Sequence, residues 1–325
     1  MNWHDTFPIS ESNSPISYDS GILCLGSCFA EVMGSKLFER KFNALVNPFG
    51  TIFNPITLSK TLLNALENTP PSEEDLISEA DLILSFEHHS TIRAKTQKEI
   101  IELIQSKNQE LKSFLQDASH LILTFGTAWV YEKKKTRNIV ANCHKQAADL
   151  FDKRLLTIHE MTQSLEACIS KIKSINPEIH IILTVSPVRH TKDGIPENQL
   201  SKSLLRVLCE ELTHKFPNSL YFPAYEIMMD ELRDYRFYKQ DRIHPSEEAE
   251  DYIWSRWTAA CMSKSTCKKM AEIEKINLEL AHKPFNPETD RHQQFLKNLL
   301  QKMERLNSEF DFSQEINLVK NQIHF

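Results

Sequence analysis

Apolar residues recur with two different periods along the chain, and the two periods predict alternating strands and helices. Short continuous apolar runs are typical of buried strands, whereas apolar positions three or four residues apart are typical of amphipathic helices. The predicted strands are Gly21 to Leu25, Phe42 to Val46, Asp81 to Phe86, His120 to Phe125, His180 to Val185 and Leu220 to Phe222. The predicted helices are Ser27 to Arg40, Pro55 to Leu66, Thr96 to Leu115, Ile158 to Ile175, Glu197 to Lys215, Tyr225 to Leu232 and Ser246 to Cys261. A hairpin with a solvated basic tip is predicted from Trp129 to Asn142.

Strands that are separated by helices predict a parallel sheet with helices on both of its faces. The runs Leu121-Ile122-Leu123 and Ile181-Ile182-Leu183 fit strands that are buried on both sides. Sheets of this kind place their ligand sites at the carboxyl ends of the strands. Ser27, Gly126 and Ser186 each fall at or just after such an end. We therefore expect these three residues to line one edge of the sheet.

The pattern of charged and apolar residues changes after the last of these helices. A charged segment from Lys268 to His282 predicts a helix, Pro284 to Pro287 predicts a break, and His292 to Leu306 predicts a further helix. We therefore expect an α/β domain over residues 1–262 and a C-terminal helical extension over residues 263–325 that packs on it.

Composition narrows the class of protein. With 325 residues, 41% hydrophobic and 25% charged, the chain is typical of soluble globular proteins, and its net charge of −6 argues against a nucleic-acid partner. No run of 18 uncharged apolar residues predicts a membrane span, and Met1 to Ser20 lacks the pattern of a signal peptide. The seven cysteines are odd in number and include no Cys-x-x-Cys pair, which favours free thiols and a cytoplasmic location. The sequence does not indicate an oligomeric state.

Two separated motifs carry the candidate chemistry. The first is Gly26-Ser27-Cys28-Phe29-Ala30, and the second is Asp241-Arg242-Ile243-His244-Pro245. A serine nucleophile needs a base for its proton, and a histidine base needs a carboxylate that orients its ring and stabilises its charge. Taken alone, the serine is a helix cap and the other two residues are a turn aspartate beside a surface histidine. If the fold joins the motifs, the protein cleaves or transfers esters.

These motifs, together with others in a fixed order, resemble the GSCFA family, which takes its name from the first of them. The resemblance covers most of the chain. The other matching segments are Asn47-Pro48-Phe49-Gly50, Phe125 to Tyr131, Asn142-Cys143-His144-Lys145 and Ser186-Pro187-Val188-Arg189-His190. That family resembles the SGNH, or GDSL, hydrolases, which implies a three-layer α/β/α flavodoxin-like fold. It also implies that Ser27 is the nucleophile, Asp241 the orienting acid and His244 the general base, with no cofactor.

The same resemblance implies an oxyanion hole, in which the Ser27 amide, at a helix start, and Gly50 are donors. Related enzymes supply a further donor from an asparagine after the third strand, where this chain has Ala128. An alanine side chain cannot donate, and the loss of one such donor slows related reactions on the order of a hundredfold. Asn142 or His144, at the returning end of the predicted hairpin, can take its place.

Residues after two predicted strands are candidates for substrate binding. Gly126 and Thr127 follow one strand, and Arg189 and His190 follow another. Arginine binds carboxylates and phosphates through its planar fork of donors, although a structural ion pair would explain Arg189 equally.

Two cysteine-containing patterns admit other chemistries. Cys28 at a helix start is either an activated thiol that attacks substrate or a small apolar group that packs inward. His88-His89 together with Cys143-His144 fits no familiar zinc spacing, so we predict no metal.

The sequence thus predicts a serine-dependent ester hydrolase or acyltransferase that forms an acyl-enzyme on Ser27. Its substrate would be a small-molecule or carbohydrate ester, and the acyl group and alcohol stay undefined. The alternative, motivated by Ala128, is a non-catalytic ligand-binding domain that keeps the fold. A thiol enzyme that uses Cys28 is a third reading of the same motif.

Overall fold

A parallel sheet of five strands, in the order β11-β10-β6-β1-β2, forms the centre of the computed structural model, which describes residues 5–323. Every neighbouring pair of strands in this sheet is parallel, as predicted. The strands are β1 (Ile22–Gly26), β2 (Ala44–Val46), β6 (His120–Phe125), β10 (His180–Val185) and β11 (Ser219–Phe222). The predicted bounds of β6 and β10 are confirmed without change, because both are continuous apolar runs.

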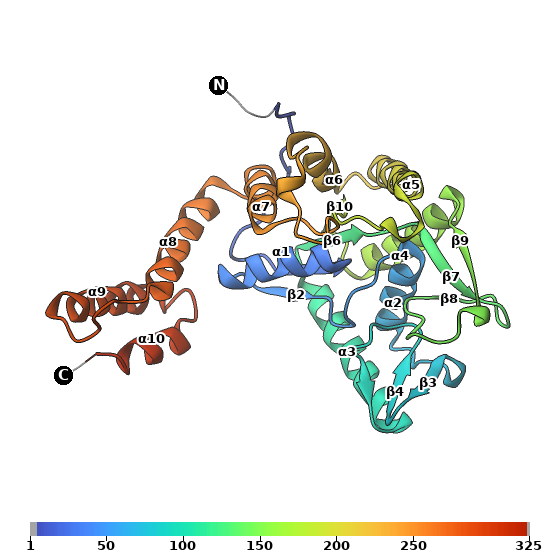
Figure 1. Cartoon of the computed structure of the whole chain (residues 1–325), viewed down its shortest axis with the longest axis horizontal. Helices are drawn as coiled ribbons and strands as arrows, with labels where there is room; N and C mark the ends of the chain where they lie inside the picture. The colour runs from blue at the N-terminus through green and yellow to red at the C-terminus, as the bar shows by residue number, and fades with distance from the viewer. Residues whose placement is uncertain (1–4, 324–325) are drawn as a thin grey trace.

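Helices cover both faces of this sheet, so the three-layer α/β/α fold is confirmed (Figure 1). One face packs against α2 (Pro55–Glu67), α3 (Gln97–Asp117), α4 (Ile158–Ile175) and α5 (Ile195–Lys215). The other packs against α1 (Cys28–Glu39) and α7 (Glu247–Cys261).

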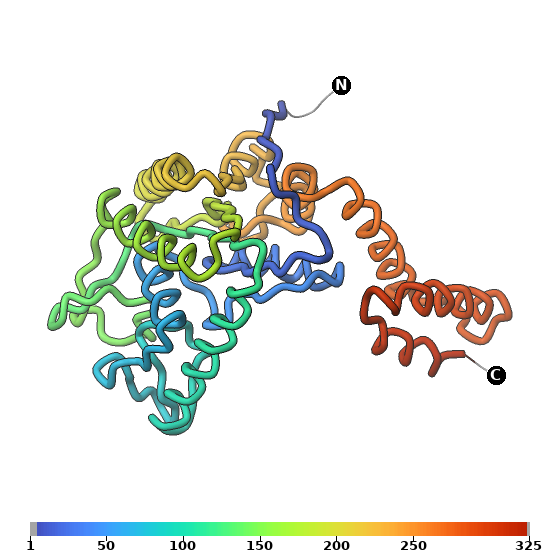
Figure 2. The backbone as a smooth tube through the Cα atoms, turned by 180° about the vertical axis from the view of Figure 1, so that it is seen from behind, coloured from blue at the N-terminus to red at the C-terminus, as the bar shows by residue number. Residues whose placement is uncertain are grey.

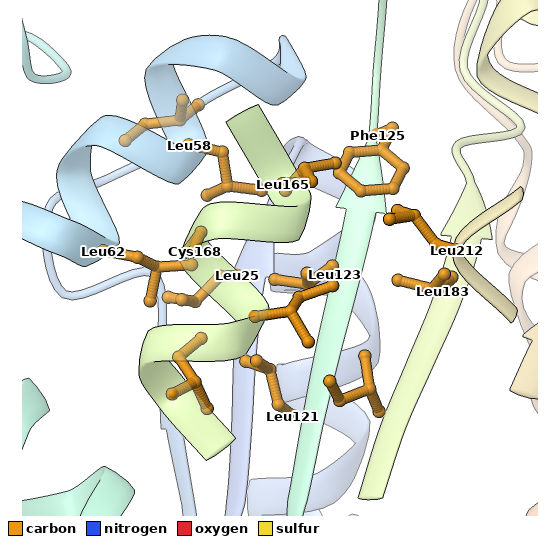
Figure 3. Packing of buried hydrophobic residues seen from close by; sticks show 14 of the residues in the cluster. Leu25, Leu58, Leu62, Leu121, Leu123, Phe125, Leu165, Cys168, Leu183 and Leu212 are labelled. Atoms are coloured by element: carbon orange, nitrogen blue, oxygen red, sulfur yellow. The ribbon is translucent and has the colours of Figure 1, made fainter. Parts of the chain in front are cut away.

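Alternate residues of each strand point to opposite faces, which divides the core in two. Leu23 and Leu25 of β1 pack with the first set of helices, whereas Ile22 and Cys24 pack with the second. Figure 3 shows the first core, in which Leu123 of β6 lies among leucines from neighbouring strands and from α2 and α4.

Two small antiparallel sheets flank the main one. The first contains β3 (Leu76–Glu79), β4 (Leu82–Ser85) and β5 (Arg93–Ala94), and the second contains β7 (Trp129–Lys133), β8 (Ile139–Val140) and β9 (Phe151–Leu155). The predicted hairpin is confirmed, since Tyr131 pairs with Val140 and Glu132 with Ile139. The predicted helix from Tyr225 to Leu232 is a short α-helix, α6 (Ala224–Glu226), followed by a π-helical turn, Ile227–Glu231.

The C-terminal helices lead away from the sheet and share a core of their own (Figure 1). They are α8 (Lys264–Ala281), α9 (Asp290–Leu306) and α10 (Ser313–Lys320), of which α10 was not predicted. They contact the rest of the chain near the end of α1: Arg40 donates to Glu274 at 2.6 Å, and Lys41 pairs with Glu315. The ring of Phe310 lies edge-on to Tyr18, with 4.6 Å between centroids.

The segment before β1 runs beside the end of α7 (Figure 2). There the N–H of Ile16 donates to the carbonyl of Cys261 at 2.7 Å, and Ile16 pairs with Met262 in a parallel bridge. Across residues 5–323, no helix combines the length and the apolar character that crossing a bilayer requires.

Candidate functional site

The carboxyl ends of three neighbouring strands meet at one edge of the sheet. The N–H of Ser27, just after β1, donates to the carbonyl of Thr124 at 3.0 Å. The N–H of Ser186, just after β10, donates to the carbonyl of Phe125 at 2.8 Å. Gly126 follows β6 directly, so the predicted grouping of Ser27, Gly126 and Ser186 at one edge is confirmed.

The turn that presents Ser27 depends on Gly26. Gly26 has a φ of +130°, and a Cβ added there would lie 2.1 Å from the carbonyl oxygen of Thr124, so only glycine fits. Its N–H donates to Oδ1 of the buried Asn47 at 2.9 Å. The Asn47 side chain therefore fixes the strand end from which α1 and Ser27 begin.

Ser27 occupies the N-cap position of α1, but its hydroxyl does not cap the helix. The side chain is fully buried, and its Oγ has no hydrogen-bond partner among the described residues. The interpretation of Ser27 as an ordinary helix cap is therefore wrong. A buried hydroxyl without a partner is uncommon in folded proteins and calls for an explanation.

Asp241 and His244 form a hydrogen-bonded pair in the loop before α7. Nδ1 of His244 lies 2.7 Å from Oδ2 of Asp241, and Oδ1 accepts the N–H groups of Ile243 at 2.8 Å and His244 at 3.0 Å. Arg242 between them has a φ of +57°, which folds the loop tightly enough for one carboxylate to accept all three bonds. These hydrogen bonds lower the pKa of Asp241 to about 2, and the main-chain N–H of His244 makes the largest contribution.

His244 of this pair and the start of α1 line the same pocket, which has a volume of about 280 Å³. His244 and Lys239 line one side of the pocket, while Cys28, Glu31 and Val32 of α1 line the other. Cys28 directly follows Ser27, so the fold brings the two separated motifs to the same pocket.

Comparison with models of known protein families identifies the family to which the chain belongs. Residues 21–257 match the model of the GSCFA family, and residues 273–325 match the model of the GSCFA domain protein, C-terminal domain. The chain belongs to the GSCFA family. No curated protein matches this GSCFA chain significantly.

The loop after β10 of the GSCFA protein is tied to the Asp241–His244 loop. The N–H of Arg189 donates to the carbonyl of Ile243 at 3.2 Å. The Arg189 guanidinium lies over the ring of Tyr238, 4.2 Å from its centroid, and 5.4 Å from the centroid of Tyr235. Arg189 is thus placed beside the candidate acid–base pair by aromatic stacking.

His190 is half-buried, and its surroundings favour the neutral ring. Burial is the main cause that lowers its pKa to about 3, and the charges of Lys202 and His244 lower it further. Its ring lies edge-on to Phe53, with 5.5 Å between centroids, and its main-chain N–H donates to Oδ1 of Asn198 at 2.8 Å. Nε2 of His190 is buried without a partner among the described residues.

The amides predicted to form the oxyanion hole have other partners in the structure. The Ser27 N–H donates to Thr124, as described above, and the Gly50 N–H donates to the carbonyl of Asn47 at 2.7 Å. Gly50 has a φ of +74° and closes the turn that carries Asn47. Either amide would have to exchange a main-chain bond for a bond to substrate.

Neither Asn142 nor His144 hydrogen-bonds to the Ser27 hydroxyl, and both have other partners. Nε2 of His144 lies 2.8 Å from the carbonyl oxygen of Ser85, and the His144 ring packs near Phe86. The Asn142 side chain accepts the N–H of His144 at 2.8 Å. The returning strand of the hairpin pairs with β7, in the small sheet, so its end packs against β4 instead of Ser27.

The main-chain N–H groups that directly follow β6 also donate hydrogen bonds within the protein. The N–H groups of Gly126 and Thr127 donate to the carbonyl of Phe53 at 2.7 and 3.1 Å. The N–H of Ala128 donates to Oγ of Ser201 at 2.7 Å. The N–H groups of Gly126 and Thr127 therefore already have acceptors within the protein.

The surroundings of Cys28 disfavour its thiolate. Burial raises the pKa of the thiol, Glu31 raises it further, and Lys202 lowers it only in part. Of the two alternatives for Cys28, this favours the small apolar group over the activated thiol. Within residues 5–323, no three His, Cys, Asp or Glu side chains gather in a way that could hold a metal ion.

Sequence reasoning missed Lys202 of α5. Its side chain is buried, and Nζ donates to the carbonyls of Gly126 and Ser186, both at 2.7 Å. The signal was present in the helical pattern, because Lys202 stands on the same apolar face as Leu205 and Cys209.

Proposed function

We propose that this protein is a serine-dependent ester hydrolase or acyltransferase with an SGNH-type mechanism. The observation that carries the proposal is the 2.7 Å contact between Asp241 and His244, on a pocket whose opposite wall begins with Cys28, the residue after Ser27. A carboxylate bound to Nδ1 leaves Nε2 of the neutral ring with a lone pair for accepting a proton.

In the proposed reaction, Nε2 of His244 takes the proton of Ser27 as Oγ attacks the ester carbonyl. The tetrahedral intermediate then collapses, the alcohol leaves with the proton from His244, and an acyl group stays on Ser27. Water or an acceptor alcohol, deprotonated by His244, releases the acyl group by the same two steps. Asp241 holds the ring and stabilises the imidazolium form.

Negative charge on the carbonyl oxygen needs hydrogen-bond donors. We assign this role to the first-turn amides of α1, because helix geometry leaves such amides without carbonyl partners. The amides of Cys28 and Phe29 support the assignment, since both lower the pKa of the Cys28 thiol and so favour negative charge beside them.

The pocket favours a compact polar ester. Glu31, Lys239 and Glu250 line it, and Lys239 donates to Glu250 at 3.2 Å. A long acyl chain against these charged groups would cost the desolvation of polar atoms without a return in hydrogen bonds. An acylated carbohydrate with a short acyl group fits this lining.

A second function, ligand binding without catalysis, is favoured by one set of observations. The Ser27 hydroxyl is fully buried and has no bond to His244, and the amides of Ser27 and Gly50 are occupied. Attack by Ser27 requires a movement that exposes its Oγ to the pocket. A domain without that movement would hold a ligand at the pocket and leave it unchanged.

Hydrolysis of aryl esters of increasing chain length tests the proposal, with Ser27→Ala as the matched control. We expect the acetate to be cleaved fastest and the Ser27→Ala variant to be inactive. Equal rates in the two proteins would remove Ser27 from the reaction. An ester that binds and is not turned over by either protein would support the ligand-binding function.

A further inference from the structure

Lys202 is a buried cation without an acidic partner. Its side chain is 1% exposed, and among residues 5–323 no carboxylate lies within ion-pair distance of Nζ. Two carbonyls, those of Gly126 and Ser186, accept from it at 2.7 Å each. An ammonium has three donors, so two carbonyls account for two of them.

Lys202 lies near the start of α1, because the carbonyl of Gly126 that it contacts directly follows β6, the strand that pairs with β1. Burial is the main cause that lowers the pKa of Lys202 and raises that of the Cys28 thiol, and the interaction between the two groups partly offsets both shifts. The ring centroid of Tyr225 lies 5.5 Å from Nζ. Ser27, which precedes Cys28, contributes a buried hydroxyl without a partner to the same region.

A purely structural link between two carbonyls does not need a charge. Burying an ammonium costs several kcal/mol more than burying a neutral donor, unless an opposite charge offsets that cost. Gly126 and Ser186 directly follow β6 and β10, and β6 also pairs with β1, the strand that leads into Ser27. The charge thus lies at the sheet edge at which the proposed reaction develops an anion.

We propose that Lys202 is a positioning residue of the candidate site: its ammonium holds the ends of β6 and β10 and supplies positive charge that favours an anion at the start of α1. The identity of that anion, the oxyanion formed from the ester carbonyl, rests on the proposed function. The contacts of Nζ with the carbonyls of Gly126 and Ser186 do not depend on that function, and the reactivity of Cys28 tests the charge separately from ester hydrolysis.

The experiment measures alkylation of Cys28 by iodoacetamide at each pH from 6 to 9, with peptide mass spectrometry to separate the cysteines. Cys28 is suitable because it lines the pocket, and Cys143, which packs in a separate cluster near Phe86, is an internal control. Lys202→Met removes the charge and keeps an unbranched side chain. Lys133→Met is the matched control, since Lys133 is a buried lysine that pairs with Asp75.

The expected pH dependence follows from the charge of Lys202. Burial lowers its pKa to about 7, so the ammonium is present below that pH and lost above it. Glu31 and Lys202 act on the pKa of the Cys28 thiol, and His244, Lys239 and Glu250 line the same pocket. All of these groups except Lys202 are the same in both proteins, so the difference in rate between the two proteins reports the charge of Lys202. At pH 6.5 we expect Cys28 of Lys202→Met to react on the order of 3- to 10-fold more slowly than in the unmodified protein, as for a rise of about half a unit to one unit in the pKa of the thiol.

Above pH 8 the two proteins should react at similar rates, and Cys143 should be unaffected throughout. Equal Cys28 rates at every pH, with circular dichroism showing both proteins folded, would overturn the proposal. If Lys202→Met does not fold, Lys202→Gln, which keeps an amide donor without the charge, must show the same loss at pH 6.5. Ester hydrolysis is a separate readout, in which Lys202→Met should lower kcat more than KM. Absent hydrolysis together with the Cys28 effect would refute the proposed function and leave the role of Lys202 intact.

Discussion

Removal of the Asn47 side chain should loosen the strand end that presents Ser27. In Asn47→Ala the Gly26 N–H loses its acceptor, which lies 2.9 Å away in a buried region. The main-chain bonds of Asn47, to Cys24 and from Gly50, persist in this variant. The effect is therefore confined to the side chain and to the backbone conformation of one residue.

Two effects determine how much stability the Asn47→Ala variant loses. A buried N–H left without a partner costs about 1–3 kcal/mol. Asn47 also has a φ of +39°, which asparagine tolerates and which costs alanine about 1 kcal/mol. Asn47→Ala should therefore lower the free energy of unfolding by about 2–4 kcal/mol.

Urea denaturation followed by circular dichroism measures this loss, and Asn47→Gly separates the two effects. Glycine removes the strain at positive φ but not the missing acceptor, so it should lose about 1–3 kcal/mol. An Asn47→Gly variant as stable as the unmodified protein would refute the claim that the Asn47 side chain holds Gly26.

Three further outcomes are expected. Cys28→Ala should keep most activity and lose about 1 kcal/mol of stability, as a small core truncation does; complete loss of turnover in a folded variant would make the thiol the nucleophile. Asp241 has a pKa of about 2, below its ordinary value near 4, so its bonds to His244 stabilise the protein above about pH 4 and weaken as pH falls through about 2; carboxyl NMR that shows titration near pH 4 would contradict the pairing. Ser27→Ala and His244→Ala should each remove nearly all esterase activity, and the double variant should be little worse than either, whereas multiplying losses would show that they do not share a step.

The centre of the main sheet could be predicted from the sequence because its inner strands are buried. β6 and β10 are continuous apolar runs, and their bounds follow directly from the pattern. By contrast, β3, β5 and β9 are short, partly exposed strands whose apolar signal is weak. The eight-residue α10 carries few apolar positions and depends on packing against α9.

The part of the candidate site that is formed by residues close together in the sequence could be predicted. Asp241 and His244 are three residues apart, so their pairing follows from a single turn. The surroundings of Ser27 depend on where distant segments fold, which no spacing reveals. The hairpin that carries Asn142 joins the small sheet, and Lys202 enters the site from a helix about 175 residues after Ser27.

The proposed nucleophile can be tested most directly by treating the protein with a fluorophosphonate and locating the adduct by peptide mass spectrometry. A serine activated by a histidine–carboxylate pair forms a covalent phosphonyl adduct, whereas an unactivated hydroxyl does not. We predict one adduct on Ser27, absent from Ser27→Ala and formed far more slowly in His244→Ala, with circular dichroism unchanged in both variants. A folded protein that carries no adduct on Ser27, or one that forms it at the same rate without His244, would contradict the assignment of Ser27 as the nucleophile.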